Sequence, residues 1–180
     1  MLTRNESIPG WTYYVLAVGR IGLGLIFLWA FIDKLFGLGI STCLNAKTGA
    51  VTVMCSQSWL QGGSPTAGFL DHAPKGPFAD VYHSMAGQAW ADWLFMGGLL
   101  FLGVALIFGV GMRLAAIGGT LLLLMLWAAV LPPASHPFLD EHIIYIFFLW
   151  TLLGTNNQQR LGLGKWWQQL AIVKRFSILC

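Results

Sequence analysis

The sequence predicts an all-α integral membrane protein: a bundle of four membrane-spanning helices forming a single domain over residues 1–180. The composition is the first observation, because 57% of the residues are hydrophobic and only 9% are charged. A soluble domain carries about 25% charged residues, so this chain has too few to cover a surface in water. The second observation is that the apolar residues gather in continuous segments. Their length approaches the roughly 20 residues with which a helix crosses a bilayer.

The apolar segments set the expected helices, since backbone polar groups in lipid must be satisfied within a segment. The weakest segment is the last, because its uncharged part, residues 143–154, is too short to span alone. Either residues 140–142 or residues 156–159 must therefore lie within the membrane. No signal peptide is expected, because the first segment is long and interrupted by Arg20. The predicted spans are residues 13–36, 92–112, 114–131 and 138–157.

The distribution of basic residues predicts the orientation, because cytoplasmic loops are enriched in lysine and arginine. With both termini in the cytoplasm of a plasma-membrane protein, the large loop at residues 39–91 lies outside. The segment 160–180 mixes tryptophan and aliphatic residues with basic ones, which fits either a short helix on the inner surface or a plain basic tail. In this orientation the inner side carries Arg4, Arg113, Arg160, Lys165, Lys174 and Arg175, against Lys47 and Lys75 outside and Lys34 at the boundary.

Two of the three cysteines, Cys43 and Cys55, share the expected outer loop. Outside the cytoplasm they can form a disulfide that closes a small loop. A redox-active pair or two free thiols are the alternatives, and the spacing is far from the CxxC of thioredoxin-like proteins. Cys180 is the last residue and is expected to face the cytoplasm.

Ionisable groups within the first span need a partner or a purpose, since charges are costly in lipid. Arg20 and Lys34 fall on one helical face, and Asp33 points away from both. Arg20 either extends toward the inner headgroups or faces the bundle interior, where it would hold a carboxylate or the polar head of a ligand.

The densest polar cluster is Asp140, Glu141 and His142, at the start of the fourth span. Asp140 or nearby Ser135 can cap that helix, so a simple helix start is one interpretation. The other is functional, because Tyr145 lies one turn further on the same face. A carboxylate, an imidazole and a phenol at membrane depth can relay protons.

Asp33, Lys34, Asp92 and residues 140–142 are expected to meet at the outer end of the bundle. They form either an ion-pair network or the polar part of a site for an amphiphile. The scattered histidines show no haem or zinc spacing, so neither haem nor metal is predicted. The net charge of +3 is dispersed, which argues against nucleic-acid binding. Aromatic residues that could line the amphiphile site are Phe27, Trp29, Phe31, Trp127, Phe147, Phe148 and Trp150.

Several motifs in order resemble the DoxX/DoxD family over about residues 12–156. They are the segment 19–39 with its Gly-Arg start and Asp-Lys pair, the Gln-Gly-Gly-Ser-Pro-Thr segment 61–66 followed by Gly-Phe-Leu at 68–70, the Gly-Val-Gly-Met-Arg segment 109–113, and Asp-Glu-His-Ile-Ile-Tyr at 140–145.

The resemblance implies a four-helix membrane subunit of a thiosulfate:quinone-type oxidoreductase. Thiosulfate would be oxidised to tetrathionate outside, and a separate DoxA-like subunit would be the partner. Quinone is then the expected cofactor and electron acceptor. A non-catalytic accessory subunit of a respiratory or oxidative-stress complex is the alternative, and a homo-oligomer is compatible with either. The candidate catalytic residues are Glu141, His142, Asp140, Arg20, Lys34 and Asp33, and the candidate quinone contacts are Arg20, Trp29, Tyr145 and Trp127.

Overall fold

The computed structural model describes residues 8–134 and 136–179, and every regular element in this part of the chain is helical. The residues Arg4, Ser135 and Cys180, considered above, lie outside the described residues. The described part of the chain is therefore all-helical, as predicted. Among the described residues, three helices are long and apolar enough to cross a membrane: α1 (Gly10–Phe36), α4 (Ala89–Phe108) and α5 (Met112–Ala129).

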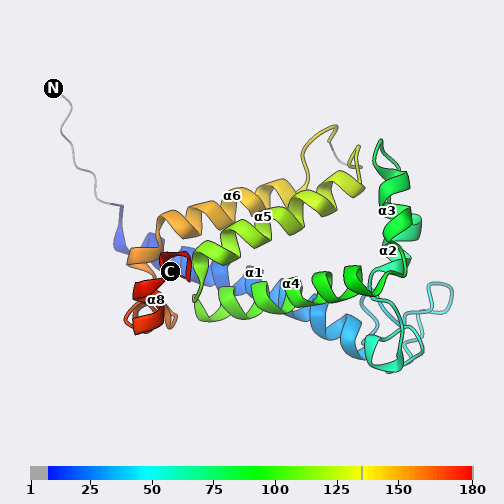
Figure 1. The fold of residues 1–180 in the computed structure, drawn as a ribbon, viewed down its shortest axis with the longest axis horizontal. Helices are drawn as coiled ribbons and strands as arrows, with labels where there is room; N and C mark the ends of the chain where they lie inside the picture. Colours follow the sequence, from blue (N-terminus) through cyan, green and yellow to red (C-terminus); the bar gives the residue numbers. More distant parts are fainter. Residues whose placement is uncertain (1–7, 135, 180) are drawn as a thin grey trace.

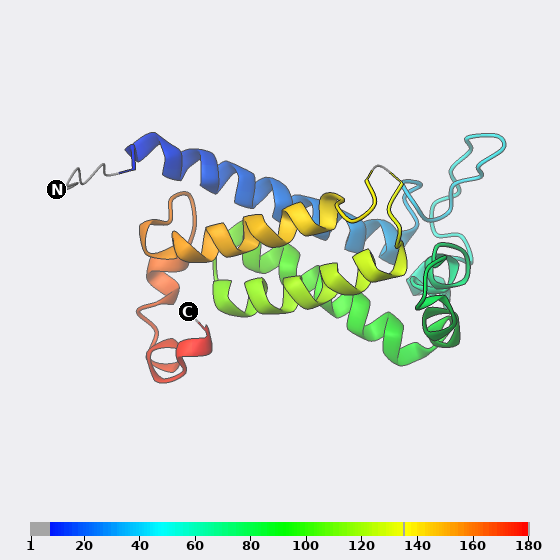
Figure 2. The same ribbon diagram turned by 90° about the horizontal axis from the view of Figure 1, so that it is seen from above.

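A fourth apolar helix, α6 (Glu141–Gly154), is shorter. The four run along the long axis of the molecule, with α1 packed on α4, α4 on α5, and α5 on α6 (Figures 1 and 2). Glycines allow two of these close approaches. A Cβ added at Gly103 would lie 2.8 Å from Leu28 on α1, and one at Gly119 would lie 2.7 Å from Leu149 on α6.

Helix α4 ends at Phe108, four residues before the expected boundary at 112. The reason is local, because Gly109 adopts a left-handed conformation with φ of 69° and caps the helix. Gly111 is also left-handed, with φ of 61°, and α5 begins directly after it. The two helices therefore leave one tight turn in opposite directions.

The segment between α1 and α4 contains η1 (Trp59–Gln61), α2 (Ala67–His72) and α3 (Ala79–Met85). A disulfide joins Cys43 and Cys55, with a Cα–Cα distance of 5.8 Å. Cys43 packs directly against Gly37, the left-handed residue that ends α1. The disulfide thus braces the chain where it leaves α1.

After α6 the described chain forms four short helical segments rather than one interfacial helix: η2 (Asn156–Gln158), α7 (Gly164–Trp167), α8 (Ala171–Arg175) and η3 (Ser177–Leu179). Leu170 is extended and separates α7 from α8. The segment returns to the α4–α5 turn, because Leu163 N donates to Phe108 O at 2.7 Å. It lies at the end of the molecule where α1 begins (Figure 1).

Candidate functional site

A cavity of about 690 Å³ lies between α4 and α5. Its volume falls within the range of about 300–1,000 Å³ that is common for small-molecule sites. The lining is apolar and aromatic, with Lys34, Thr66 and Tyr82 as its polar side chains. Prominent among the other lining residues are Phe69, Trp90, Trp93, Phe95, Phe101, Leu121 and Met125.

The cavity exists because α4 and α5 diverge from their shared turn (Figure 1). At the far end, residues 64–85 cross from one helix to the other. We call this segment, which includes α2 and α3, the roof. Pro65, Thr66, Tyr82 and Met85 of the roof contribute to the lining.

Asp92 on α4 holds one side of the roof. Its Oδ1 atom accepts hydrogen bonds from Ser64 Oγ at 2.9 Å, from Thr66 N at 3.1 Å and from Thr66 Oγ1 at 2.7 Å. Ser64 Oγ also accepts from Ala67 N at 3.1 Å, where α2 begins. A buried carboxylate in an apolar helix is stable when it is hydrogen-bonded in this way. The Ser-Pro-Thr segment is therefore fixed to the start of α4.

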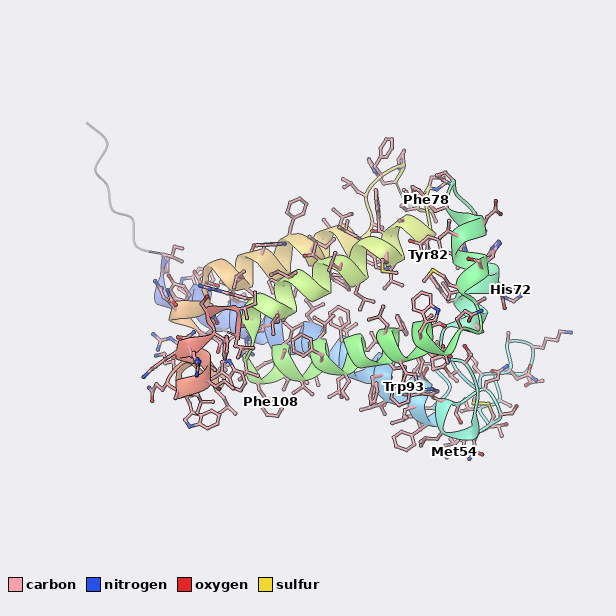
Figure 3. All side chains as sticks on the ribbon, in the orientation of Figure 1. Met54, His72, Phe78, Tyr82, Trp93 and Phe108 are labelled. Carbon is pink, nitrogen blue, oxygen red and sulfur yellow. A yellow bond between two sulfur atoms is a disulfide. The ribbon has the colours of Figure 1, made fainter. Side chains whose placement is uncertain are left out.

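Tyr82 holds the other side of the roof. Its side chain points from α3 toward α5 (Figure 3), and its hydroxyl donates to Met125 O at 2.8 Å. Burial raises the pKa of the Tyr82 phenol above its ordinary value of 10.0. The phenol therefore remains a hydrogen-bond donor at neutral and mildly alkaline pH.

Of the candidate site residues from the sequence, Lys34 is the one that lines the cavity. Its Nζ atom donates to Ser41 Oγ at 2.9 Å. Neighbouring Asp33 is 1% exposed, and both of its carboxylate oxygens accept hydrogen bonds. It accepts from Ile40 N at 2.9 Å, from Ser41 N at 3.0 Å and from Ser41 Oγ at 2.8 Å. Asp33 thus fixes the turn after α1, and Lys34 places a charge at the cavity.

Arg20 is 1% exposed and points into the protein, at the opposite end from the roof. Nη1 donates to Leu106 O and to Ile107 O, the latter at 3.0 Å, in the last turn of α4. Nη2 donates to Arg160 O at 3.2 Å and to Leu161 O at 2.8 Å. The final carbonyls of a helix lack helical partners and carry partial negative charge, which a cation stabilises. Arg20 therefore joins α1, the end of α4 and the segment after α6.

Asp140 is the N-cap of α6. Its Oδ1 atom accepts from His142 N at 3.0 Å and from Ile143 N at 3.4 Å, and Oδ2 lies 2.7 Å from His142 Nδ1. Glu141 is exposed, and Tyr145 packs partly buried against the core. Potential ligand atoms of residues 140–142 lie within 4.8 Å of one another, but none of the three residues lines the cavity.

The aromatic residues expected around an amphiphile lie outside this cavity. Phe27 belongs to the hydrophobic core, and Trp29 is half exposed. Trp127 Nε1 donates to Phe138 O at 2.9 Å, which places it beside the loop before α6. Neither Trp29 nor Trp127 is part of the lining, whereas Trp90 and Trp93 are.

No protein-family model, curated protein or solved structure matches the chain. The resemblance to the DoxX/DoxD family consequently rests on the sequence motifs alone.

Sequence reasoning placed Asp92 at the outer end of the bundle, but it missed the roof and the roles of Asp92 and Tyr82 in holding it. A signal for one of them was present, because Asp92 is an acidic residue at the start of an apolar run and the hydroxyl-rich segment 64–66 precedes it. For Tyr82 there was no such signal. The cavity below the roof is apolar and has one ammonium group, that of Lys34, in its lining. Such a site suits a ligand that has an apolar body and a polar or anionic head.

Proposed function

We propose that the protein is the membrane subunit of a quinone-linked oxidoreductase and that it binds quinone between α4 and α5. The observation that carries this proposal is the cavity of about 690 Å³, apolar except for Lys34, Thr66 and Tyr82. A quinone has the matching chemistry, with a ring bearing carbonyl oxygens and a long hydrocarbon tail. Its ring oxygens would lie near Lys34 and its tail against the aromatic and aliphatic walls.

Lys34 supplies the electrostatic part of this proposal. Ser41 Oγ takes one hydrogen bond from the Lys34 ammonium, which has further protons to donate. A quinone oxygen gains negative charge on reduction, so an ammonium group in an apolar site favours the reduced form. The proton relay proposed for Asp140, Glu141 and His142 would act at a distance from this ring, since none of the three lines the cavity.

Thiosulfate is the proposed electron donor, on the strength of the family resemblance. Two thiosulfate ions each lose one electron and join through a new sulfur–sulfur bond to give tetrathionate. Quinone takes up the two electrons with two protons. A separate DoxA-like subunit, or subunits of a respiratory complex, would be the protein partner, and assembly as a homo-oligomer is compatible with this scheme.

The proposed topology has four spans in the plasma membrane, with both termini in the cytoplasm and the roof outside. The distribution of lysine and arginine supports it, because more of these residues lie at the inner end than in the outer loop, which carries Lys47 and Lys75. Helix α6 would span together with its flanking residues, and the segment 160–180 would lie on the inner surface. The described basic residues at the inner end are Arg113, Arg160, Lys165, Lys174 and Arg175.

The experiment is to measure thiosulfate-driven quinone reduction in membranes with and without the chain. The variant Lys34→Met removes the ammonium and keeps the side-chain length, and we expect it to lower the rate by at least about tenfold. Lys47→Met is the matched control, because Lys47 is an exposed lysine in the loop after α1 and does not line the cavity. Its rate should equal that of the wild type.

The same assay tests the cluster of Asp140, Glu141 and His142 with the double variant Glu141→Gln, His142→Asn. Unchanged turnover in this variant would remove both residues from the mechanism. Equal rates in membranes with and without the chain would contradict the oxidoreductase proposal. An accessory, non-catalytic role would then be the better description.

A further inference from the structure

We infer that the cavity exchanges its ligand sideways with the lipid bilayer, through an opening between α4 and α5 that Gly97, Gly98 and Gly118 keep clear. This inference rests on the proposed quinone site. It narrows the ligand class to amphiphiles whose tail stays in the bilayer while the head occupies the cavity.

The walls of the cavity are open on the side that would face lipid. Trp93 and Leu94 on α4 line the cavity and are 69% and 61% exposed, and Leu121 on α5 is 61% exposed. All three belong to helices apolar enough to cross a membrane. Side chains that border a cavity and also face outward mark its opening, and here the surrounding medium would be lipid.

The two ends of the cavity are more closed than the side that would face lipid. At the roof, Asp92 holds residues 64–66 and Tyr82 is bonded to Met125 O at 2.8 Å. At the other end, α4 and α5 converge on their turn, and Leu102 and Leu106 are buried there. A ligand that reaches the cavity without unfastening the roof must pass between the two helices.

The glycines of these helices fall into two groups. Those at helix contacts have a packing reason, because a Cβ at Gly24 or Gly103 would lie within 3.0 Å of a neighbouring helix. At Gly97 and Gly118 a Cβ would meet nothing within 4 Å, and at Gly98 it would meet Leu122 at 3.6 Å. All three line the cavity. Glycine destabilises the interior of a helix. We infer that glycine is present at these positions because its missing side chain leaves space in the wall of the cavity.

The glycines also lie at matching depth. Gly97 is about 12 Å along α4 from Ala89, and Gly118 is about 16 Å along α5 from Ala129, given a rise of about 1.5 Å per residue. Because the helices are antiparallel, the glycines line the cavity at similar depth below the roof, from its two walls. A ligand with its head near Lys34 would pass its tail between them into the hydrocarbon region.

The first experiment measures the association rate of a decyl-tailed benzoquinone with the full chain in phospholipid nanodiscs, by quenching of tryptophan fluorescence. Gly118→Phe fills the opening, and we expect it to lower the association rate by at least about tenfold. Gly22→Phe is the matched control, because Gly22 lies in α1, has nothing within 4 Å of an added Cβ and does not line the cavity. Its rate should be unchanged.

Loading through the roof would give the opposite pattern. Ser64→Ala loosens the roof, since Ser64 Oγ bonds to Asp92, and Ser64 itself does not line the cavity. A faster rate in Ser64→Ala together with an unchanged rate in Gly118→Phe would overturn the inference. If Gly118→Phe does not fold, Gly97→Leu takes its place, because it fills the opening from the α4 wall.

A second experiment needs no quinone. Vesicles containing a phospholipid with a diazirine in its tail are irradiated, and the cross-linked residues are mapped by mass spectrometry. We expect cross-links at Leu102, which is buried yet lines the cavity, and their loss in Gly118→Phe. Cross-links confined to outward residues such as Val18 would refute the opening.

The two experiments separate the two proposals. Lipid cross-links at Leu102 without quinone binding would refute the quinone site and retain the opening. Quinone binding at a rate insensitive to Gly118→Phe, without cross-links at Leu102, would retain the quinone site and refute the opening.

Discussion

The hydroxyl of Tyr82 lies 2.8 Å from the backbone carbonyl oxygen of Met125 and donates a hydrogen bond to it. Through this bond the roof touches α5, while Asp92 holds the roof to α4 on the other side of the cavity. The cavity is thus a space between two helices that the loop above them holds apart. Its lining therefore includes residues of the loop as well as residues of the two helices.

Replacement of Tyr82 by phenylalanine keeps the ring and removes this hydrogen bond. We expect the free energy of unfolding to fall by about 1 kcal/mol, the usual net value of one hydrogen bond. Thermal or denaturant unfolding in nanodiscs measures the change. Tyr14→Phe is the control, because Tyr14 is half exposed on α1. Equal stability of Tyr82→Phe and the wild type would show that the bond does not fasten the roof.

The same variant predicts a pH dependence. Burial raises the pKa of Tyr82 above 10.0, so the folded state retains the phenolic proton longer than the unfolded state does. The resulting stabilisation is fully present below about pH 10 and is lost as pH rises through the folded pKa. The stability difference between wild type and Tyr82→Phe should be constant between about pH 7 and pH 9 and shrink above pH 10. A difference that already shrinks near pH 8 would contradict the assignment.

Replacement of Asp92 by alanine removes the acceptor of three hydrogen bonds. We expect a loss of about 3 kcal/mol, because bonds to charged groups are stronger than neutral ones and leave donors unpaired when lost. The roof should also open more often, so trypsin should cleave faster after Lys75, which is exposed there. Asp80→Ala is the control, since Asp80 is exposed on the same segment. Identical cleavage rates in both variants would show that Asp92 does not hold the roof.

Replacement of Arg20 by lysine keeps the positive charge but removes the planar guanidinium group and its two donor nitrogens, Nη1 and Nη2. Because the guanidinium serves four carbonyl oxygens, we expect a loss of about 3 kcal/mol in the free energy of unfolding. Arg113→Lys should change stability by less than about 0.5 kcal/mol, since the exposed Arg113 donates one bond to Ser177 O. An equal, small effect of the two variants would mean that charge alone matters at Arg20.

Replacement of Cys43 and Cys55 by serine tests whether the disulfide is a brace or a redox group. The bridge closes a loop with a sequence separation of 12, so its removal should cost about 2–3 kcal/mol of stability. Neither cysteine lines the cavity, and quinone binding should be retained. Loss of thiosulfate-driven turnover with quinone binding intact would instead assign the pair a redox role.

The apolar runs predicted the helices well because length and hydrophobicity alone decide which segments can cross a bilayer. The end of α4 was set too late, since the left-handed Gly109 that caps the helix also fits within an apolar run. Burial of Arg20 was among the alternatives, but its partners are backbone carbonyls, which no side-chain pattern reveals. The cavity was not predictable from the sequence. It depends on the divergence of α4 and α5 and on the space that is left where these helices carry glycine.

The unequal lengths of α1 and α6 have a consequence for the surrounding lipid. With about 1.5 Å per residue, the 27 residues of α1 extend about 40 Å and the 14 residues of α6 about 21 Å. In the proposed topology, a bilayer with a uniform core of about 30 Å matches neither helix by itself. Helix α1 would then tilt, and the leaflets would thin beside α6 and its flanking residues. Such thinning would bring headgroups and water down to the start of α6. The carboxylate and imidazole of Asp140 and His142 would then stay hydrated, at a depth that is dry on the other side of the protein.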